Sequence, residues 1–474
     1  MSNENSAQLV VIGGGPGGYA AAFLAADLGM KVTLIDSEPN PGGVCLYRGC
    51  IPSKALLHAA KVLTEAHEAE AFGVSFGKPN LDINKLRSWK EGVVAQMTGG
   101  LGVLSKQRKI NYIEGRATFV DNKTLNVEKL DGSAQNLTFE NAILATGSLP
   151  ATVPAFNIGS DRIWNSTSAL ELRNVPQNLL VVGGGYIGLE LGTVYNALGS
   201  QVSVVEMTNG LLPGADRDLV DILAKRVKAM FHSVMLETKV VSMTEEENGI
   251  RVVFEGDNVQ EKEQLFENVL VSVGRVPNSK NIGLENTDIQ VDKRGFVQID
   301  AQRRTTVPNI FAIGDIAGDP MLAHKASHEG RLAVEVIAGH AAAWEPKAIP
   351  AVVFTDPEIA WAGITENEAA KQGIAVEVAR FPWAASGRAT TLGRNDGVTK
   401  LLLEPQTQRV LGVGICGQGA GELIAEGVLA VEMAAVADDV KFSIHPHPTL
   451  SETMMESAEA FFGQATHIYR PKRK

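Results

Sequence analysis

The chain has 474 residues, which is enough for several domains, each with a hydrophobic core of its own. Its composition is that of an ordinary globular protein, with 45% hydrophobic and 20% charged residues. The formal net charge is −11, and no basic run precedes the tail at residues 470–474, so nucleic acid is not an expected partner.

The N-terminal segment, residues 1–6, is polar and lacks the basic and apolar regions of a secretory signal. No stretch of about 18 consecutive apolar residues occurs, so no membrane association is expected. The three cysteines are too few for a disulfide-rich secreted scaffold and favour a reducing compartment. We therefore expect a cytoplasmic protein.

A nucleotide-binding pattern begins at residue 9. The apolar run 9–12 predicts a buried parallel strand that leads into a glycine-rich turn and a helix. A second strand, 31–35, ends at Asp36, which stands 23 residues after the first glycine (36 − 13). Glycines in such a turn let a pyrophosphate approach the helix N-terminus, and the carboxylate can accept hydrogen bonds from ribose hydroxyls. The motif glycines are Gly13, Gly15 and Gly18.

Two cysteines, Cys45 and Cys50, follow in a glycine-rich stretch that leads into a helical pattern at 54–67. Residues five apart lie on different faces of a regular helix, so the two sulfurs can meet only if Cys45 lies in an irregular loop before the helix. A helix N-terminus also favours the thiolate of a nearby cysteine. The spacing fits a redox-active disulfide; two unpaired cysteines that behave as small hydrophobic residues are the alternative.

The nucleotide-binding pattern then recurs. The apolar run 180–182 precedes a second glycine-rich turn, and a strand at 201–205 ends at Glu206, again 23 residues after the first glycine (206 − 183). Gly29 and Gly199, which close the two helices, are separated by the same 170 positions as the two turns. The second set of motif glycines is Gly183, Gly185 and Gly188. Two dinucleotides are therefore expected to bind this chain.

The neighbours of each unit indicate which dinucleotide it binds. No Arg or Lys follows Glu206 closely, and a carboxylate there repels a 2′-phosphate, so NAD is favoured over NADP. The first unit is followed within ten residues by the cysteine pair. Because a flavin is the usual carrier between a dithiol and a hydride acceptor, we assign FAD to the first unit and NAD to the second.

Further positions stand out toward the C-terminus. A strand at 310–313 runs into Asp315, which would suit either a flavin contact or a helix N-cap. His447 lies between two prolines that restrict the backbone, and Glu452 follows five residues later. The segment 449–452 is also a capping-box pattern, so Glu452 could merely start a helix. Cys416 lies in an apolar strand pattern and is expected to be an inert core residue.

Together these features resemble the flavin-dependent pyridine nucleotide-disulfide oxidoreductases, and within them the dihydrolipoamide dehydrogenase (E3) branch, over essentially the whole chain. The motifs that carry the resemblance are residues 42–54, 145–147, 183–190, 312–315, 321–326 and 445–452. The resemblance implies an α/β fold with two Rossmann-like dinucleotide-binding domains and a C-terminal α+β dimerisation domain. The implied boundaries are 1–149 for the FAD-binding domain, 150–278 for the NAD-binding domain, 279–348 for a central domain that completes the FAD site, and 349–474 for the interface domain.

The resemblance also implies the activity, which is oxidation of protein-bound dihydrolipoamide to lipoamide with NAD⁺. A substrate thiolate would attack Cys45, and Cys50 would face the flavin. His447 would act as the acid–base catalyst at the disulfide of the other subunit of a homodimer, and Glu452 would orient it. The implied partner is the lipoyl-bearing acyltransferase (E2) of a 2-oxo acid dehydrogenase complex, which would present the dihydrolipoamide.

Further cofactor contacts are implied for Lys54, Thr146, Gly147, Glu190, Gly274, Asp315, Met321, Leu322, Ala323 and His324. Lys54 and Glu190 would pair beside the flavin, although two solvated helix charges are the alternative. No metal site is expected. The chain departs from the commonest family pattern at Val44, Tyr47 and Asp36. A glutathione reductase is the main alternative within the family, and a structural flavoprotein subunit is the alternative outside catalysis.

Overall fold

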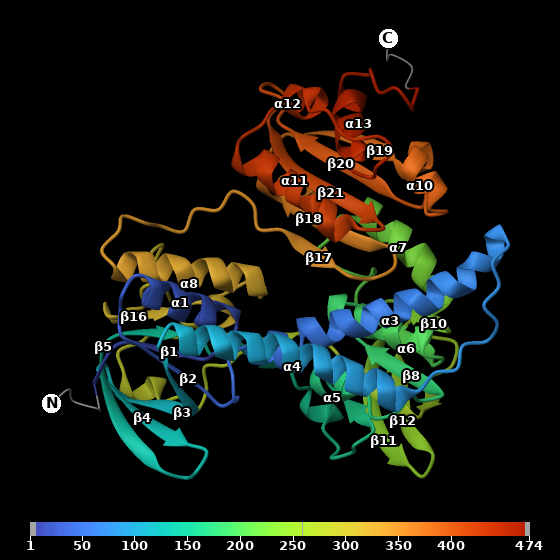
Figure 1. The fold of residues 1–474 in the computed structure, drawn as a ribbon. Coiled ribbons are helices and arrows are strands. Elements are labelled where there is room, and N and C mark those ends of the chain that lie inside the picture. Colours follow the sequence, from blue (N-terminus) through green and yellow to red (C-terminus); the bar gives the residue numbers. More distant parts are fainter. Residues whose placement is uncertain (1–5, 258, 470–474) are drawn as a thin grey trace.

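The computed structural model describes residues 6–257 and 259–469 (Figure 1). Residues 1–5, in the polar N-terminal segment, and the basic tail at 470–474 lie outside the described residues. None of the helices within the described ranges has the length and apolar character that crossing a membrane requires.

The first nucleotide unit is built on a six-stranded sheet. Its strands are β1 (Ser6–Ile12), β2 (Val32–Asp36), β3 (Asn111–Asp121), β4 (Thr124–Lys129), β5 (Ala134–Leu144) and β16 (Ile310–Ala312). β1 pairs in parallel with β2 and β5, and β16 adds to the far side of β5, also in parallel. Leu9, Val10 and Val11 are fully buried, which explains the continuous apolar sequence of β1.

Helices α1 (Pro16–Asp27) and α8 (Ala323–Ile337) pack against each other beside this sheet. Glycines make the contact close, because a Cβ on Gly330 of α8 would lie 2.5 Å from the carbonyl oxygen of Gly17 on α1. Both helices begin where strands of the sheet end, at the carboxyl edge where parallel sheets bind their ligands.

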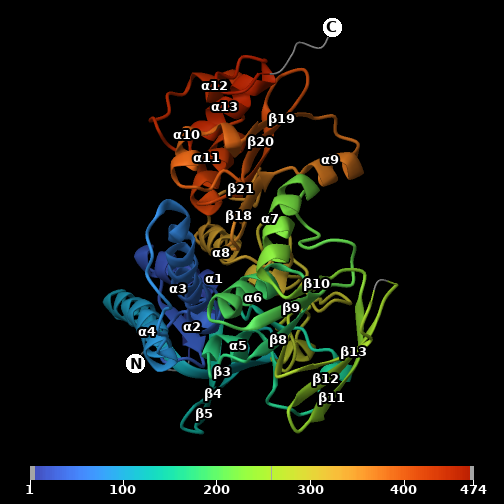
Figure 2. The same ribbon diagram turned by 90° about the vertical axis from the view of Figure 1, so that its right-hand side faces the viewer.

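Three helices are inserted between β2 and β3 of the first unit: α2 (Gly43–Arg48), α3 (Cys50–Glu68) and α4 (Ile83–Gln107). The last two form a long helical pair that extends away from the first sheet (Figure 1). α3 packs against α6 (Tyr186–Ala197) of the second nucleotide unit, so the helix that follows the cysteines bridges both units (Figure 2).

The second nucleotide unit has a five-stranded parallel sheet in the order β10-β9-β8-β14-β7. These strands are β7 (Ile163–Trp164), β8 (Asn178–Val182), β9 (Gln201–Val205), β10 (Ser233–Met235) and β14 (Asn268–Val271). The unit also contains helices α5 (Ser166–Glu171), α6 and α7 (Arg217–Met230) and an antiparallel sheet of β11 (Lys239–Glu246), β12 (Gly249–Glu255) and β13 (Glu263–Phe266). The short pair β6 (Ser148–Pro150) and β15 (Arg275–Pro277) joins the two units.

The C-terminal unit, β17 to α13, has a five-stranded antiparallel sheet in the order β17-β18-β21-β20-β19. Its strands are β17 (Ala351–Val353), β18 (Glu358–Gly363), β19 (Glu377–Pro382), β20 (Val398–Leu403) and β21 (Val410–Gly417). Its helices are α9 (Glu366–Gln372), α10 (Gly387–Thr391), α11 (Ala420–Glu432), α12 (Ala437–Phe442) and α13 (Glu452–Phe461). Short 3-10 helices occur along the chain at Ala69–Phe72, Pro154–Phe156, Leu284–Asn286, Gly314–Ala317 and Trp383–Ala385.

The first unit has a mixed sheet, in which β4 pairs antiparallel with β3 and β5 and the other pairs are parallel. Together with the parallel sheet of the second unit and the antiparallel sheet of the third, it confirms the predicted fold class. Cys416 is fully buried in β21, as predicted, and burial raises the pKa of its thiol.

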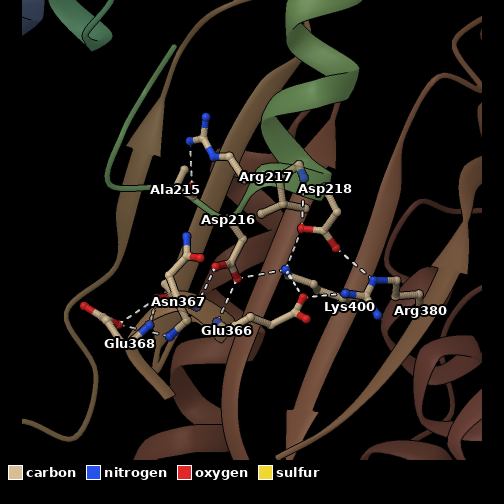
Figure 3. Close-up of polar contacts among 11 residues, drawn as sticks. Ala215, Asp216, Arg217, Asp218, Glu366, Asn367, Glu368, Arg380 and Lys400 are labelled. Carbon is tan, nitrogen blue, oxygen red and sulfur yellow. Dashed lines mark hydrogen bonds and ion pairs between the residues drawn. The ribbon is translucent and has the colours of Figure 1, made fainter. Parts of the chain in front are cut away.

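A buried charged cluster joins the second nucleotide unit to the C-terminal unit (Figure 3). The side chain of Lys400 on β20 is 1% exposed, and its Nζ lies 2.8 Å from Asp216, 2.7 Å from Asp218 and 2.6 Å from Glu366. Arg380 on β19 pairs with Asp218 and Glu366. Asp216 also accepts the first two backbone N–H groups of α9, so it caps a helix of the neighbouring unit. Although burial lowers the pKa of Lys400, the three carboxylates raise it.

We expect Lys400→Met to reduce the free energy of unfolding by about 3–5 kcal/mol, because it leaves three carboxylates facing one another around a buried apolar side chain. Urea denaturation of the FAD-loaded protein measures the loss. Lys61→Met is the matched control, because it removes the exposed ion pair with Glu65 (3.7 Å) and should cost less than about 1 kcal/mol. Similar losses in the two variants would contradict a special role for the cluster.

Candidate active site

A cavity of about 810 Å³ lies where the first nucleotide unit, the helices α2 and α3, and the second nucleotide unit meet. This volume is in the range of about 300–1,000 Å³ that is usual for cofactor sites. The predicted site residues that line it are Gly13, Gly15, Asp36, Cys45, Cys50, Lys54, Thr146, Gly147, Glu190, Asp315, Met321 and Ala323. The other predicted residues do not line it: Gly18, Gly183, Gly185, Gly188, Glu206, Gly274, Leu322, His324, His447 and Glu452.

The first glycine motif has no space for a Cβ at Gly13 or at Gly18. Gly13 has φ +103°, and a Cβ on it would lie 2.3 Å from the carbonyl oxygen of Ala145. A Cβ on Gly18 would lie 1.8 Å from the carbonyl oxygen of Gly13. Gly18 therefore keeps α1 close to the turn without touching the cavity, and the backbone N–H groups at the start of α1 face an anion site.

Each nucleotide unit uses its terminal carboxylate to hold its own glycine turn. Asp36 accepts the N–H of Gly14 (2.5 Å), and Glu206 accepts the N–H of Gly184 (2.7 Å). The other carboxylate oxygen accepts the backbone N–H two residues beyond the acid, at 2.9 Å and 2.8 Å. Equivalent donors stand 170 residues apart (184 − 14), so the repeat extends to individual hydrogen bonds. Burial raises the pKa of Asp36, although its two amide hydrogen bonds lower it.

The second glycine turn lies at the start of α6, outside the cavity. A Cβ on Gly188 would lie 2.4 Å from the carbonyl oxygen of Gly183, which repeats the contact seen in the first unit. Arg217 reaches the segment that follows Glu206, but its guanidinium donates to the carbonyl oxygens of Leu211 (2.8 Å) and Leu212 (2.6 Å). Because Arg217 is held by these carbonyl oxygens, it is not free to bind a 2′-phosphate, and the Glu206 carboxylate would repel one. Both features support NAD rather than NADP.

The cysteine pair lies at a break between two helices. We expected Cys45 in an irregular loop, and this was wrong: Cys45 is inside the short helix α2, and α3 begins at Cys50. The helical path is interrupted at Gly49, where a Cβ would lie 2.8 Å from the carbonyl oxygen of Val44. This break, rather than a loop before Cys45, brings the two sulfurs together.

In the dithiol form, a hydrogen bond between the two sulfurs raises the pKa of Cys45, and the same bond together with the Lys54 ammonium lowers the pKa of Cys50 to about 7. Cys50 is therefore the thiolate of the pair, with Cys45 as the donor.

Lys54 and Glu190 form an ion pair between α3 and α6, with Nζ 2.8 Å from Oε2. The Glu190 side chain is 4% exposed, so the alternative of two solvated helix charges does not hold. Ser53 also donates to the same oxygen (3.2 Å), and the backbone N–H of Phe354 donates to Oε1 (3.0 Å).

Asp315 lies in the cavity wall, in the 3-10 helix that follows β16. Its carboxylate accepts the Ser148 hydroxyl, and Arg275 Nε donates to the same hydroxyl oxygen at 2.7 Å. No side-chain cap bond forms at this helix, so the N-cap alternative for Asp315 does not hold.

Several other predicted cofactor residues lie in the segments that connect one unit to the next. Thr146 donates to the carbonyl oxygen of Asn278 (2.8 Å), whose N–H donates back to Gly147 (2.9 Å). The carbonyl oxygen of Gly274, at φ +122°, accepts a backbone N–H (2.9 Å). His324 lies at the start of α8 with Nε2 2.8 Å from a carbonyl oxygen of the link to β17, and burial lowers its pKa. Leu322 precedes α8 as its N-cap residue.

His447 and Glu452 pair as predicted, with Nδ1 2.9 Å from Oε1. The His447 side chain is 70% exposed, so Nε2 faces solvent. The second Glu452 oxygen accepts the N–H of Thr449 (2.7 Å), so this residue holds the backbone before α13 and the histidine at once. Although burial raises the pKa of Glu452, these two hydrogen bonds lower it.

One chain does not bring His447 to its own cysteines. The cavity-lining residues end at Ala326 along the sequence. In both views α12 and α13, which flank His447, lie at the far end of the C-terminal unit, and Figure 2 places α2 well away from them.

Three residues at the site were missed by the sequence reasoning. Ser148 and Arg275 connect to Asp315, and Phe354 connects to Glu190. Ser148 and Arg275 directly follow the predicted Gly147 and Gly274, so position next to a motif glycine was a usable signal. Nothing in the local sequence of Phe354 marks it.

The residues of the cavity fit a flavin dinucleotide. A turn without side chains faces the N-terminus of α1, where a pyrophosphate would bind, and the Asp36 carboxylate lies at the end of β2, where a ribose would bind. A redox ring would then be enclosed by the cysteines, the Lys54–Glu190 pair and Asp315.

Comparison with known proteins agrees with this geometry. Residues 7–330 match the family model described as pyridine nucleotide-disulphide oxidoreductase, and residues 349–458 match the dimerisation domain of the same family. Dihydrolipoyl dehydrogenases from Vibrio cholerae and Haemophilus influenzae are both 49% identical over 474 residues, covering 100% of this chain and 99% of theirs. The enzyme of the same name from Geobacillus stearothermophilus is 45% identical over 461 residues, which is 97% of each chain.

Solved structures are similar over nearly the whole length. LpdA from Mycobacterium tuberculosis has a TM-score of 0.89 at 25% identity, covering 96% of this chain and 99% of its own. The HOCl-induced flavoprotein disulfide reductase RclA from Escherichia coli has a TM-score of 0.84 at 27% identity, covering 94% and 98%. The chain belongs to the pyridine nucleotide-disulphide oxidoreductase family, and within it to the FAD- and NAD-dependent dihydrolipoyl dehydrogenases.

Proposed function

We propose that Cys45, Cys50, His447 and Glu452 carry the dihydrolipoyl dehydrogenase reaction of this chain, with dihydrolipoamide as the electron donor and NAD⁺ as the acceptor. The observation that supports this most is the Cys45–Cys50 pair in the wall of the cavity that begins at the first glycine turn. Bound FAD supplies the two-electron chemistry that connects a dithiol to NAD⁺.

The reaction begins with Cys45 and Cys50 joined as a disulfide. His447 takes the proton of one substrate thiol, and the resulting thiolate attacks Cys45 Sγ, which breaks the Cys45–Cys50 bond and releases the Cys50 thiolate. The second substrate thiol displaces Cys45 from the mixed disulfide, and Cys45 takes up the proton that this thiol loses. Lipoamide leaves as a disulfide, and its two electrons stay on the enzyme dithiol.

The surroundings of Cys50 suit this product. The hydrogen bond from Cys45 and the Lys54 ammonium hold the pKa of Cys50 at about 7. Its thiolate is therefore populated above about pH 7 and is lost as the pH falls below this value.

The position of His447 supports a two-fold dimer in which His447 serves Cys45 of the partner subunit. Large apolar side chains of the same C-terminal unit are exposed on the single chain: Leu429 (62%), Met433 (72%), Phe442 (71%) and Ile444 (98%). Large apolar side chains exposed in this number on one unit are typical of a surface that another protein covers.

We further propose a division of the chain into functional domains, a location in the cell and a protein partner. The functional domains are 1–149 for FAD, 150–278 for NAD, 279–348 to complete the FAD site and 349–474 for the subunit interface. The protein works in the cytoplasm and takes its dihydrolipoamide from the lipoyl-bearing acyltransferase (E2) of a 2-oxo acid dehydrogenase complex. The net charge of −11 suits a basic docking surface on that partner.

Steady-state turnover of the FAD-loaded protein tests this function. NADH should form rapidly from dihydrolipoamide and NAD⁺, and no reaction should occur with oxidised glutathione and NADPH. Activity with NADPH and glutathione alone would overturn the NAD assignment at Glu206. A flavin-loaded protein that is inactive in both assays would support the structural-subunit alternative.

A further inference from the structure

All three units of the fold meet at one buried carboxylate, that of Glu190. Glu190 Oε2 accepts from Lys54 Nζ (2.8 Å) and Ser53 Oγ (3.2 Å), both from α3. Glu190 Oε1 accepts the backbone N–H of Phe354 (3.0 Å), which belongs to the C-terminal unit. A buried carboxylate needs such a set of donors, and together they fix its orientation. The C-terminal unit therefore takes part in holding a charge that belongs to the cavity.

The side chain of Phe354 makes a second contact at the same point. The Lys54 ammonium lies over the Phe354 ring, with Nζ 4.5 Å from the ring centroid. An ammonium at this distance is attracted by the negative face of the ring. The Lys54 side chain is still 33% exposed, so the ring competes with water for the ammonium. Without the ring, Lys54 would gain hydration and the freedom to turn away from Glu190.

The position of this ammonium matters for Cys50, one turn earlier on α3. The groups that face Cys50 are Cys45 from α2, Lys54 from α3 itself, Glu190 and Tyr186 from α6, and Tyr19 from α1. Lys54 is the one cation in this described set. A shift of its charge by a few ångströms changes the field at the Cys50 sulfur.

We infer that Phe354 is a positioning residue: its backbone N–H orients Glu190 and its ring holds the Lys54 ammonium, so the C-terminal unit sets the positive field at the dithiol. Phe354 acts through Lys54 and does not touch the reacting sulfurs. The inference rests on the proposed role of Cys50, but its test reads the chemistry of one thiol and does not depend on turnover.

The test is the pH dependence of Cys50 alkylation in FAD-loaded Cys45→Ser protein, in which Cys50 stays a free thiol. Iodoacetamide labelling is followed by mass spectrometry, and the buried Cys416 serves as the unreactive reference. With Phe354 intact, the labelling rate should follow a thiolate titration. Phe354→Leu should move the midpoint of this titration to higher pH, because leucine does not hold the Lys54 ammonium near Cys50. At a pH below the midpoint, the labelling rate should be several-fold lower than with Phe354. Phe354→Tyr should keep the midpoint.

Two controls separate the ring face from general packing. Phe462→Leu removes a similar contact with Lys441 (4.6 Å) in the same unit and should leave the Cys50 midpoint unchanged. Mono-, di- and trifluorinated phenylalanine at position 354 keep the shape but weaken the negative face stepwise, so the midpoint should rise stepwise. Equal midpoints for Phe354 and Phe354→Leu would overturn the inference. A shift in Phe354→Leu without any shift in the fluorinated series would overturn the role of the ring face.

Discussion

Serine at either Cys45 or Cys50 should abolish dihydrolipoamide turnover and leave FAD bound. Thiol–disulfide exchange needs one sulfur to be attacked and a second to leave, and a serine hydroxyl can do neither. FAD should stay because the glycine turn, Asp36 and Asp315 belong to the cavity wall and are unchanged in both variants. NADH formation measures the first effect, and the absorbance of the flavin that copurifies measures the second.

The matched control is Cys416→Ala. Cys416 is fully buried in β21, in the sheet of the C-terminal unit, and does not line the cavity, so its replacement should leave turnover unchanged. Wild-type turnover in either active-site serine variant would contradict the assignment of the dithiol. Loss of FAD in both variants would instead show that the cysteines help to build the cavity.

The parts of the site that follow from repeated local geometry could be predicted from the sequence. Both units have a strand, a glycine turn and an acidic residue 23 positions after the first glycine of the turn, and both adopt the same local backbone. The match includes the hydrogen bond from Gly14 to Asp36 and its equivalent from Gly184 to Glu206. Spacing on a helix was less informative at the cysteines. A single break at Gly49 was enough to change which element carries Cys45, because the short helix α2 replaced the expected loop.

Contacts between units could not be predicted, because they depend on how separate elements pack. Phe354 meets Lys54 from 300 positions further along the chain (354 − 54), and no local pattern marks it. Lys400 lies on β20, and the three acids around it lie at the start of α7 and on α9. No sequence motif connects these positions. Glu452 was read as either the start of a helix or a partner of His447. It is both, because it is the first residue of α13 and one of its oxygens accepts from His447.

His447→Gln should slow reduction of the enzyme by dihydrolipoamide about 10²–10⁴-fold, the usual contribution of a general base. Nδ1 is occupied by Glu452, so Nε2 is the atom that can accept the substrate proton, and glutamine cannot replace it. NADH-driven reduction of a dye does not use the dithiol and should change little. Stopped-flow measurement of the two half-reactions checks this, and equal losses in both would remove the proposed role.

The same variant tests which chain His447 serves. Consider a dimer of one Cys45→Ser chain and one His447→Gln chain. If each site is built from two chains, one of the two sites is intact, because the His447→Gln chain supplies both cysteines and the Cys45→Ser chain supplies the histidine. A site built within one chain is broken in both subunits. Unfolding and refolding an equal mixture of the two inactive variants should therefore restore about a quarter of wild-type turnover, since half of the dimers are mixed and each has one working site. No recovery from a mixture that has regained its FAD would mean that His447 acts on the cysteines of its own chain.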